Sequence, residues 1–298
     1  MHTATSLNLL FDYDFKLDVC EQLRRVHAAG FQYIDMNFWD WGHSEKSPFM
    51  QDGWQDWVRR IKECGDELGI RFHQSHCMAL NPYDGNPVNE WRAEAARRSI
   101  IGSGMLGIDW TVFHVADRNG AWGVENPDDP KFADEEQQIA CNHEFIEPYL
   151  ELAVKNKVGI ALENMNGRSQ NKFSLRYPTN AEQLNRLVDS FHSDSIGVCW
   201  DIGHAHCQQL NQYEEICKLG HRLKVLHVQD NNGQSDQHTA PYYGTVDWKA
   251  VKRALDEINY PGEFTFEAHM LIRRCPDDIT RDAAARLLYL LGEYVIHL

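Results

Sequence analysis

The chain has 298 residues, of which 43% are hydrophobic, and its 44 acidic and 29 basic side chains give a formal net charge of −15. This length suffices for one large α/β barrel or two smaller domains, and the apolar content supports a substantial core. The negative charge disfavours a nucleic-acid backbone as the partner and favours a small polar or neutral ligand.

Short apolar runs alternate with segments of helical periodicity throughout the chain. In the first half the runs predict strands at residues 6–11, 31–38, 71–78 and 109–116. Helices are expected after them at residues 17–29, 54–68, 88–106 and 134–156. Gly30 and Gly69 follow the first two helices as stop signals, and Pro148 should kink or break the fourth.

The second half continues the same alternation. Strands are predicted at residues 158–165, 196–200, 223–230 and 263–268, and helices at 179–189, 212–219, 247–258 and 276–298. Eight strands alternating with eight helices, without a linker, predict an α/β protein with a single (β/α)8 TIM barrel over residues 1–298. The alternative is an open doubly wound sheet, which the lack of a glycine-rich dinucleotide fingerprint after the first strand disfavours.

Eight cysteines occur without a CxxC pair and lie mostly inside apolar patterns, which is typical of reduced core thiols. The N-terminus lacks a basic-then-apolar leader, and no run of about 18 apolar residues could span a bilayer. We therefore expect a cytoplasmic protein that has no membrane partner and is compatible with a homo-oligomer.

Four of the predicted strands end in a side chain that can bind a metal: Glu163, Asp201, His227 and Glu267. In a barrel the C-terminal ends of all strands lie on one face, so these side chains should converge despite their separation in sequence. Three carboxylates gathered beside one imidazole would repel one another without a cation. The set predicts one divalent metal and suits Mn²⁺, Mg²⁺, Co²⁺ or Zn²⁺, whereas Glu163 taken alone could simply pair with Arg168.

Further polar side chains are predicted on the same face: His76, His114, His204, Asp236 and His238. They could bind substrate hydroxyls, support the metal ligands or hold additional metals, because imidazole serves each of these purposes. Trp39, Trp41 and Trp122 fall in loops at the mouth, where flat apolar rings suit the C–H faces of a sugar. His73 has the opposite strand parity and is interpreted as structural.

Five motifs give the chain a resemblance to a known family: Leu162-Glu163-Asn164, Asp201-Ile-Gly-His204, His227-Val-Gln-Asp-Asn, Ser235-Asp-Gln-His238 and Phe266-Glu267. With them the chain resembles the xylose-isomerase-like barrel superfamily, which includes ketose 3-epimerases, inosose dehydratase and endonuclease IV. The resemblance implies that Glu163, Asp201, His227 and Glu267 hold one divalent metal, commonly Mn²⁺. It also implies that Glu163 and Glu267 form the acid/base pair and that His204 contacts a substrate oxygen.

The chain departs from the ketose 3-epimerases at two positions. Ser169 stands where they carry a second glutamate, and Gly233 stands where they carry an arginine after the metal histidine. A second pattern matches the trinuclear-zinc endonuclease, whose nine ligands have counterparts in order at His76, His114, Glu163, Asp201, His204, His227, Asp236, His238 and Glu267. Sugar-isomerase relatives keep much of this pattern, and the net charge of −15 without a basic stripe argues against a DNA-binding enzyme.

The residues and the resemblance agree on a sugar isomerase or epimerase that removes a proton next to a carbonyl and proceeds through a metal-stabilised enediolate. Its substrate is expected among the sugars and keto-sugars, with contacts from His76, His114, His204, His238, Trp39 and Trp122. Returning the proton to the other face gives epimerisation, and returning it to the neighbouring carbon gives isomerisation. The alternatives are a keto-sugar dehydratase or lyase acting by β-elimination, a metal-dependent phosphodiester hydrolase and a metal-binding barrel without catalysis.

Overall fold

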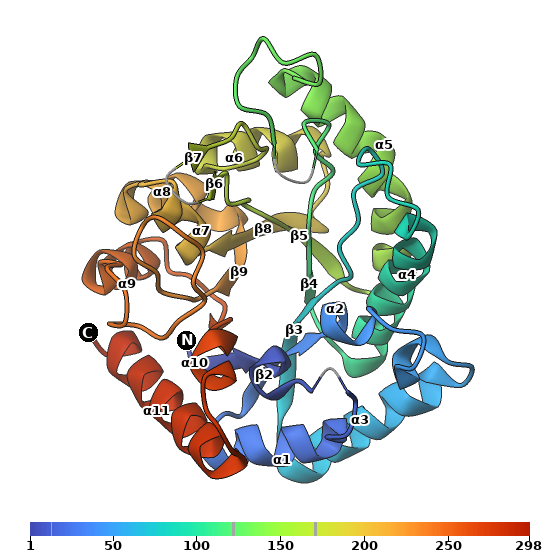
Figure 1. The fold of residues 1–298 in the computed structure, drawn as a ribbon, viewed down its shortest axis with the longest axis vertical. Helices are drawn as coiled ribbons and strands as arrows, with labels where there is room; N and C mark the ends of the chain where they lie inside the picture. Colours follow the sequence, from blue (N-terminus) through green and yellow to red (C-terminus); the bar gives the residue numbers. More distant parts are fainter. Residues whose placement is uncertain (13, 121–122, 170–171) are drawn as a thin grey trace.

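The computed structural model describes residues 1–12, 14–120, 123–169 and 172–298, which form a ring of parallel strands inside a ring of helices (Figure 1). The strands of the 8-stranded sheet are ordered β10-β1-β2-β3-β4-β5-β8-β9. A parallel bridge between Val228 and Phe266 links the two ends of this sheet. The predicted (β/α)8 barrel is therefore confirmed, and the alternative of an open doubly wound sheet is wrong.

Short strands make the barrel wall, and longer helices surround it. The strands are β1 (Thr3–Ser6), β2 (Tyr33–Asn37), β3 (Arg71–His76), β4 (Trp110–Phe113), β5 (Gly159–Glu163), β8 (Ile196–Asp201), β9 (Leu223–His227) and β10 (Phe264–Phe266). The outer helices are α1 (Val19–Ala29), α3 (Trp54–Leu68), α4 (Asn89–Leu106), α5 (Glu135–Lys155), α6 (Ala181–Ser190), α8 (Gln212–Leu219), α9 (Trp248–Glu257) and α11 (Asp278–Ile296). Asp134 and Gln137 form a capping box that begins α5, and α5 then continues through Pro148. The predicted break at Pro148 is therefore wrong, and the predicted kink stays a prediction.

Short elements that the sequence did not predict follow several strands. They are α2 (Phe38–Trp41) after β2, α7 (Ile202–Cys207) after β8 and α10 (His269–Arg273) after β10. Between β5 and α6, β6 (Arg168–Ser169) pairs antiparallel with β7 (Lys172–Phe173). The 3₁₀ turns are η1 (Leu7–Leu10), η2 (Pro48–Met50) and η3 (Gly220–Arg222). Elements at the C-terminal ends of barrel strands border the mouth, so their placement shapes any site there.

The first strand lies elsewhere than the prediction at residues 6–11. β1 spans Thr3–Ser6, whose β-branched threonines favour a strand, and it pairs with both β2 and β10. Leu7–Leu10 instead form η1, which begins at Ser6 because its hydroxyl accepts a hydrogen bond from Asn8 N at 3.4 Å. The apolar run thus marks a buried turn that follows the strand.

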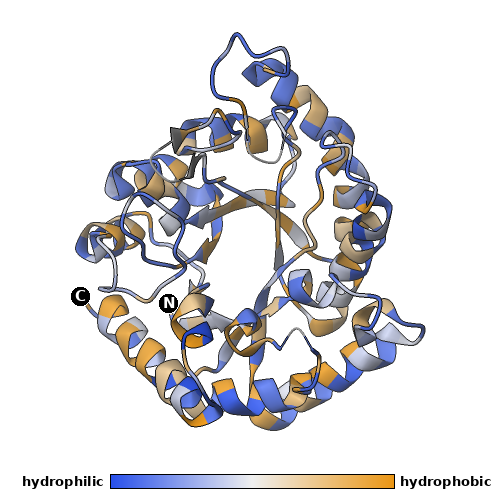
Figure 2. Cartoon of the chain, in the orientation of Figure 1, coloured by the Kyte–Doolittle hydropathy of each residue, from blue (hydrophilic) through white to orange (hydrophobic). Residues whose placement is uncertain are grey.

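Alternate residues of each strand face the barrel interior, and this alternation decides which side chains reach its mouth. An apolar layer inside the barrel consists of Val112, Ala161, Cys199 and Val225, with Trp110 packed against it. Leu162, between two inward residues, joins the core between strands and helices instead. Figure 2 shows β8 as largely hydrophobic, whereas the segment leading into α5 is mainly hydrophilic. Glu163, Asp201 and His227 lie two residues beyond members of the interior layer, so they also point into the barrel.

All eight cysteines are free thiols, and six of them are buried, as the sequence predicted. Within the described residues, no helix combines the length and the apolar character needed to cross a bilayer. The cytoplasmic location and the homo-oligomer stay predictions.

Candidate metal centre

The four side chains predicted to bind a metal meet at the C-terminal mouth of the barrel. Glu163, Asp201 and His227 are the last residues of β5, β8 and β9, and Glu267 directly follows β10. One ligand atom from each lies within 4.8 Å of the ligand atoms of the other three. The first three side chains are at most 1% exposed, and that of Glu267 is 12% exposed. The structure therefore shows the convergence that a barrel was expected to produce.

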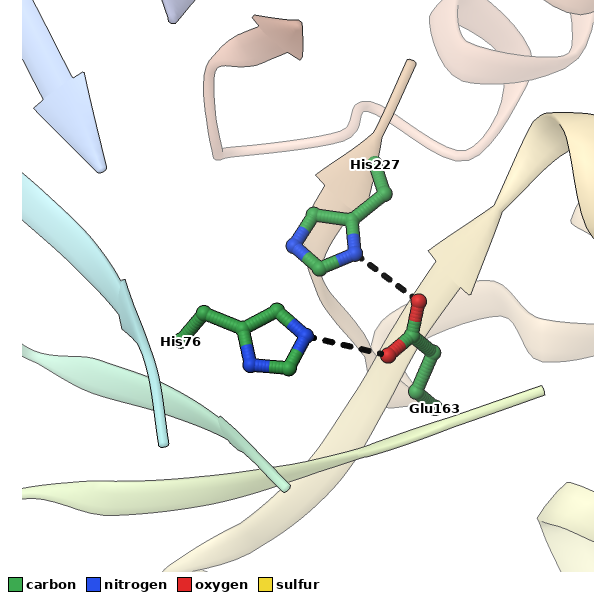
Figure 3. Close-up of side chains that lie close together, drawn as sticks. All are labelled: His76, Glu163 and His227. Carbon is green, nitrogen blue, oxygen red and sulfur yellow. Dashed lines mark hydrogen bonds and ion pairs between the residues drawn. The ribbon is translucent and has the colours of Figure 1, made fainter. Parts of the chain in front are cut away.

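Glu163 lies at the centre of this cluster. Its Oε1 is 2.8 Å from His227 Nδ1 and its Oε2 is 3.7 Å from His76 Nε2, so the two rings approach the carboxylate from different sides (Figure 3). His227 Nδ1 is also 3.6 Å from Glu267 Oε2. Asp201 Oδ2 is buried without a hydrogen-bond partner among the described residues, whereas Glu163 Oε2 has His114 Nε2 2.9 Å away. A bound cation would satisfy the buried Asp201 Oδ2.

Burial and the charges of the neighbours act against each other in the cluster. Burial would raise the pKa of Glu163, but neighbouring imidazoles, foremost His227, hold that pKa well below its usual value. Burial would likewise lower the pKa of His227, whereas the surrounding acidic groups raise it well above its usual value. Burial and the neighbouring carboxylates raise the pKa of Asp201 to about 6. A protonated imidazole thus compensates the carboxylates, and a divalent metal would take the place of that proton.

Histidines from β3 and β4 form one wall of the mouth. His76 closes β3, and His114 follows β4 with its Nε2 2.9 Å from Glu163 Oε2. Trp39, in α2, packs its ring against both, with centroid distances of 5.3 Å to His76 and 5.0 Å to His114. Because Trp39 is only partly buried, part of its ring is left exposed beside these histidines, and its predicted contact with substrate stays a prediction.

Other side chains that the sequence singled out lie elsewhere. Trp41 is buried and packs against Trp57, so the prediction that it lies at the mouth is wrong. Trp122, predicted to contact substrate, lies outside the described residues, and its role stays a prediction. His73 is buried within the barrel with its Nε2 2.8 Å from Thr265 Oγ1, which agrees with a structural role.

A second cluster lies beside the first and consists of His204, Asp236 and His238, whose ligand atoms lie within 4.8 Å of one another. Asp236 Oδ2 is 3.2 Å from His204 Nε2 and 3.1 Å from His238 Nε2. Each ring is oriented from behind, because Nδ1 of His204 lies 2.8 Å from Asn164 O and Nδ1 of His238 lies 2.9 Å from Glu267 O. Burial would lower the pKa of His238, but Asp236 raises it to about 10. This cluster can hold a cation or donate hydrogen bonds to an oxygen-rich ligand.

The two carboxylate oxygens of Asp201 have different surroundings. Oδ1 caps α7 by accepting a hydrogen bond from His204 N at 2.6 Å, whereas Oδ2 has no hydrogen-bond partner among the described atoms. The backbone of Asp201 is tied to β5 by Asn164, whose amide oxygen accepts from Asp201 N at 2.7 Å and whose amide nitrogen donates to Asp201 O at 2.9 Å. One oxygen is thus committed to the fold, and the other is left for a ligand.

Sequence reasoning gave no role to three buried residues that support the site: Asn164, Gln229 and Asp35. Gln229 Nε2 donates to both Asp201 Oδ1 and Asp236 Oδ1, so it connects the two clusters. Asp35 Oδ2, inside β2, lies 3.8 Å from His227 Nε2. Sequence signals could have found two of these three residues: Gln229 has the inward parity of His227, and Asp35 is a carboxylate within a buried strand.

Residues 23–289 match the model of the xylose isomerase-like TIM barrel family, and the chain belongs to this family. The resemblance that the strand-end motifs indicated is thereby confirmed. The family's barrel and the cluster of buried carboxylates and imidazoles together define a protein with a site that could hold a metal ion.

The chain is 26% identical over 272 residues to the uncharacterized protein y4fM of Sinorhizobium fredii, a match that covers 82% of this chain and 79% of that protein. It is 34% identical over 87 residues to a mannonate dehydratase of Oceanobacillus iheyensis, covering 27% of this chain and 25% of the dehydratase. The structure of 3-keto-D-glucoside 4-epimerase from E. coli covers 100% of both chains, with a TM-score of 0.72 and 15% identity. IolI with a bound zinc atom covers 99% of this chain and 98% of its own, with a TM-score of 0.71 and 18% identity. At these identities the two structures establish a shared fold.

Proposed function

We propose that the protein is a divalent-metal-dependent sugar isomerase or epimerase that removes a proton next to a carbonyl. The observation that carries the proposal is the convergence of Glu163, Asp201, His227 and Glu267 at the mouth of a xylose isomerase-like barrel. A carboxylate-rich site with one imidazole suits Mn²⁺, with Mg²⁺, Co²⁺ and Zn²⁺ as alternatives. The zinc atom bound to IolI supports a metal in this fold.

The donor set fits such an ion. One of its buried carboxylate oxygens, Asp201 Oδ2, lacks a hydrogen-bond partner among the described atoms, and three carboxylates outnumber the one imidazole. When bound, a divalent ion supplies Lewis-acid polarisation of a sugar carbonyl, which acidifies the neighbouring C–H group. Proton transfer then falls to the carboxylates of the chain.

Glu163 and Glu267 are the proposed proton-transfer pair. They come from β5 and β10, which are not neighbours in the barrel, so they can approach a sugar from different sides. Burial opposes their ionisation, but the surrounding imidazoles hold the pKa of both below the usual value, and both can act as bases near neutral pH. His238, whose raised pKa keeps it protonated, can supply a proton to the group that returns one to the sugar.

Substrate contacts are proposed from the imidazoles and the flat ring at the mouth, which are His76, His114, His204, His238 and Trp39, and also from Trp122, which lies outside the described residues. Imidazoles suit vicinal hydroxyls because a neutral ring can donate and accept a hydrogen bond, whereas a protonated ring such as that of His238 can donate from both nitrogens. His76 and His114 lie 3.7 and 2.9 Å from Glu163 Oε2, and His204 and His238 lie 3.2 and 3.1 Å from Asp236 Oδ2. Trp39 packs against His114, and this arrangement supports the proposed role.

Solvent exchange tests the proposed chemistry. Mn²⁺-loaded protein is incubated in D₂O with D-fructose, D-tagatose and D-psicose, and deuterium at the carbon next to the carbonyl is measured by NMR and mass spectrometry. We expect deuterium incorporation, and Glu163→Gln and Glu267→Gln should each slow it by a factor of about 10² to 10⁴. Glu215→Gln neutralises a buried carboxylate that instead binds Ala181 N and Lys218 among the outer helices, and should keep the exchange. Sugar conversion without solvent hydrogen, or activity confined to abasic DNA, contradicts the proposal.

A second candidate function, metal-dependent phosphodiester hydrolysis, is favoured by the arrangement of the mouth into three groups that could hold a metal. These are His76 with Glu163 and His227; His204 with Asp236 and His238; and Glu163, Asp201, His227 and Glu267. Three Zn²⁺ per chain by mass spectrometry would support the hydrolase, whereas one ion would support enediolate chemistry. The net charge of −15 opposes a polyanionic substrate.

A keto-sugar dehydratase or lyase would use the same central metal but would expel a β-substituent after proton removal. The local similarity to a mannonate dehydratase supports this alternative. Loss of water from the product, detected as a mass decrease, distinguishes elimination from isomerisation or epimerisation, which conserve mass.

A further inference from the structure

Asp35 is a carboxylate in the middle of β2, away from the strand ends, and it is completely buried. Its Oδ2 accepts a hydrogen bond from Gln74 Nε2 at 3.4 Å, and its Oδ1 has no hydrogen-bond partner among the described atoms. A buried carboxylate with so few hydrogen bonds destabilises a fold unless another group compensates it. Its place inside an apolar strand therefore points to a partner.

His227 directs its two ring nitrogens at different neighbours. Nδ1 lies 2.8 Å from Glu163 Oε1 and 3.6 Å from Glu267 Oε2, on the side of the proposed metal. Nε2 lies 3.8 Å from Asp35 Oδ2 and, like Asp35 Oδ1, is buried without a hydrogen-bond partner in the described structure. The stacked ring of His76, 5.2 Å away and inclined by 10°, restricts the plane of the imidazole. The ring thus bridges the metal ligands and Asp35.

We infer that Asp35 is a positioning residue of the metal centre. This inference rests on the metal site of the proposed function. A neutral imidazole carries one N–H, and the nitrogen that binds a metal must be the other one. Since Nδ1 of His227 faces the other ligands, the ring proton belongs on Nε2, and Asp35 is positioned to accept it. The 3.8 Å between His227 Nε2 and Asp35 Oδ2 exceeds the usual N–H···O distance by roughly 1 Å or less. A small movement of either side chain brings the two atoms within hydrogen-bonding distance.

Such a hydrogen bond holds the tautomer of His227, orients the ring and makes Nδ1 more basic toward a metal. Gln74 supports the arrangement, because its Nε2 also donates to Leu226 O at 3.3 Å and its Oε1 accepts from Thr265 Oγ1 at 3.1 Å. Gln74 thereby ties Asp35 to β9, the strand that carries His227, and to β10. Asp35 acts on the substrate only through His227.

The metal affinity of Asp35→Asn tests this inference, because asparagine keeps the size of the side chain and removes its charge. Metal-free protein is titrated with Mn²⁺ by calorimetry, and we expect the Kd of the variant to be ten- to a hundred-fold higher than that of the wild type. Glu215→Gln is the matched control and should keep the wild-type Kd, since Glu215 serves α6 and α8. A general loss of stability lowers the melting temperature of either variant without changing the Kd.

A second measurement needs no folded Asp35 variant. In the Zn²⁺-loaded wild type, imidazole ¹⁵N–¹H correlation spectra, assigned with His227→Gln, report which nitrogen of His227 carries the proton. We expect a proton on Nε2, with a downfield resonance caused by the charge-assisted hydrogen bond to Asp35. A proton on Nδ1, or a Kd for Asp35→Asn within twofold of the wild type, overturns the inference and leaves the proposed function intact. A wild type that binds no metal overturns both.

Discussion

Metal binding should stabilise the folded chain by an amount that can be calculated in advance. A ligand that binds only the folded state at a hundred times its Kd adds about 2.7 kcal/mol to the free energy of unfolding. Unfolding entropy of about 2.1 cal/mol/K per residue gives roughly 0.6 kcal/mol/K for the chain of 298 residues. Saturation of chelator-treated protein with Mn²⁺ should therefore raise the melting temperature by about 4 °C.

Asp201→Asn separates metal binding from the fold. Asparagine caps helices as well as aspartate does, so α7 keeps its cap and the metal-free variant should melt close to the metal-free wild type. The variant loses the negative charge of the carboxylate whose Oδ2 has no hydrogen-bond partner among the described atoms. The increase in its melting temperature on adding Mn²⁺ should therefore be about 1 °C or less. Glu215→Gln should begin from a lower melting temperature and still show the full rise.

Differential scanning calorimetry at matched Mn²⁺ concentrations, with and without chelator, measures these shifts. The reasoning fails if the wild type shows no rise with Mn²⁺, Mg²⁺, Co²⁺ or Zn²⁺. It also fails if Asp201→Asn gains as much as the wild type, because the ion would then not depend on that carboxylate.

Two further outcomes are expected from the second cluster and its support. If His204 and His238 contact the sugar as proposed, His204→Ala and His238→Ala should leave the metal count by mass spectrometry unchanged and lower kcat/KM by a factor of about ten to a thousand, the loss expected for a buried polar contact. A fall in bound metal would rule out that role for the residue. A Cβ at Gly203 would lie 2.0 Å from the side chain of Gln229. Gly203→Ala should therefore lower the free energy of unfolding by about 1–3 kcal/mol and the melting temperature by roughly 2–5 °C. An unchanged melting temperature would show that the side chain of Gln229 moves aside without cost.

The convergence of the four candidate ligands could be predicted from the sequence because each of them stands where a short apolar run stops. Strand ends are local features, and the barrel brings them together whatever their separation in the chain. The predicted strands at 158–165 and 223–230 ran past Glu163 and His227, and the one at 196–200 stopped just before Asp201, but the end of the apolar run marked each of these residues. The same local logic explains why β1 was misplaced: Thr3–Ser6 is only weakly apolar, and its pairing with β2 and β10 on both sides makes it a strand.

The parts that escaped prediction depend on distant or very short-range geometry. Asp35 gains its partner only when β9 places the ring of His227 across the barrel interior. Trp39 and Trp41 were both assigned to the mouth as loop residues, but α2 winds through them and turns the second ring into the core. α7 has 6 residues, too few to show a helical period in the sequence.

Asp201 satisfies two chemical specifications at once, and together they leave position 201 almost no freedom. The start of α7 requires a short oxygen-bearing side chain, and serine, threonine, asparagine and aspartate meet that requirement. The divalent ion proposed beside Glu163 favours a carboxylate ligand, and glutamate and aspartate supply one. Aspartate alone belongs to both sets. A saturation library at this codon, selected for both folding and metal loading, should therefore return a single amino acid.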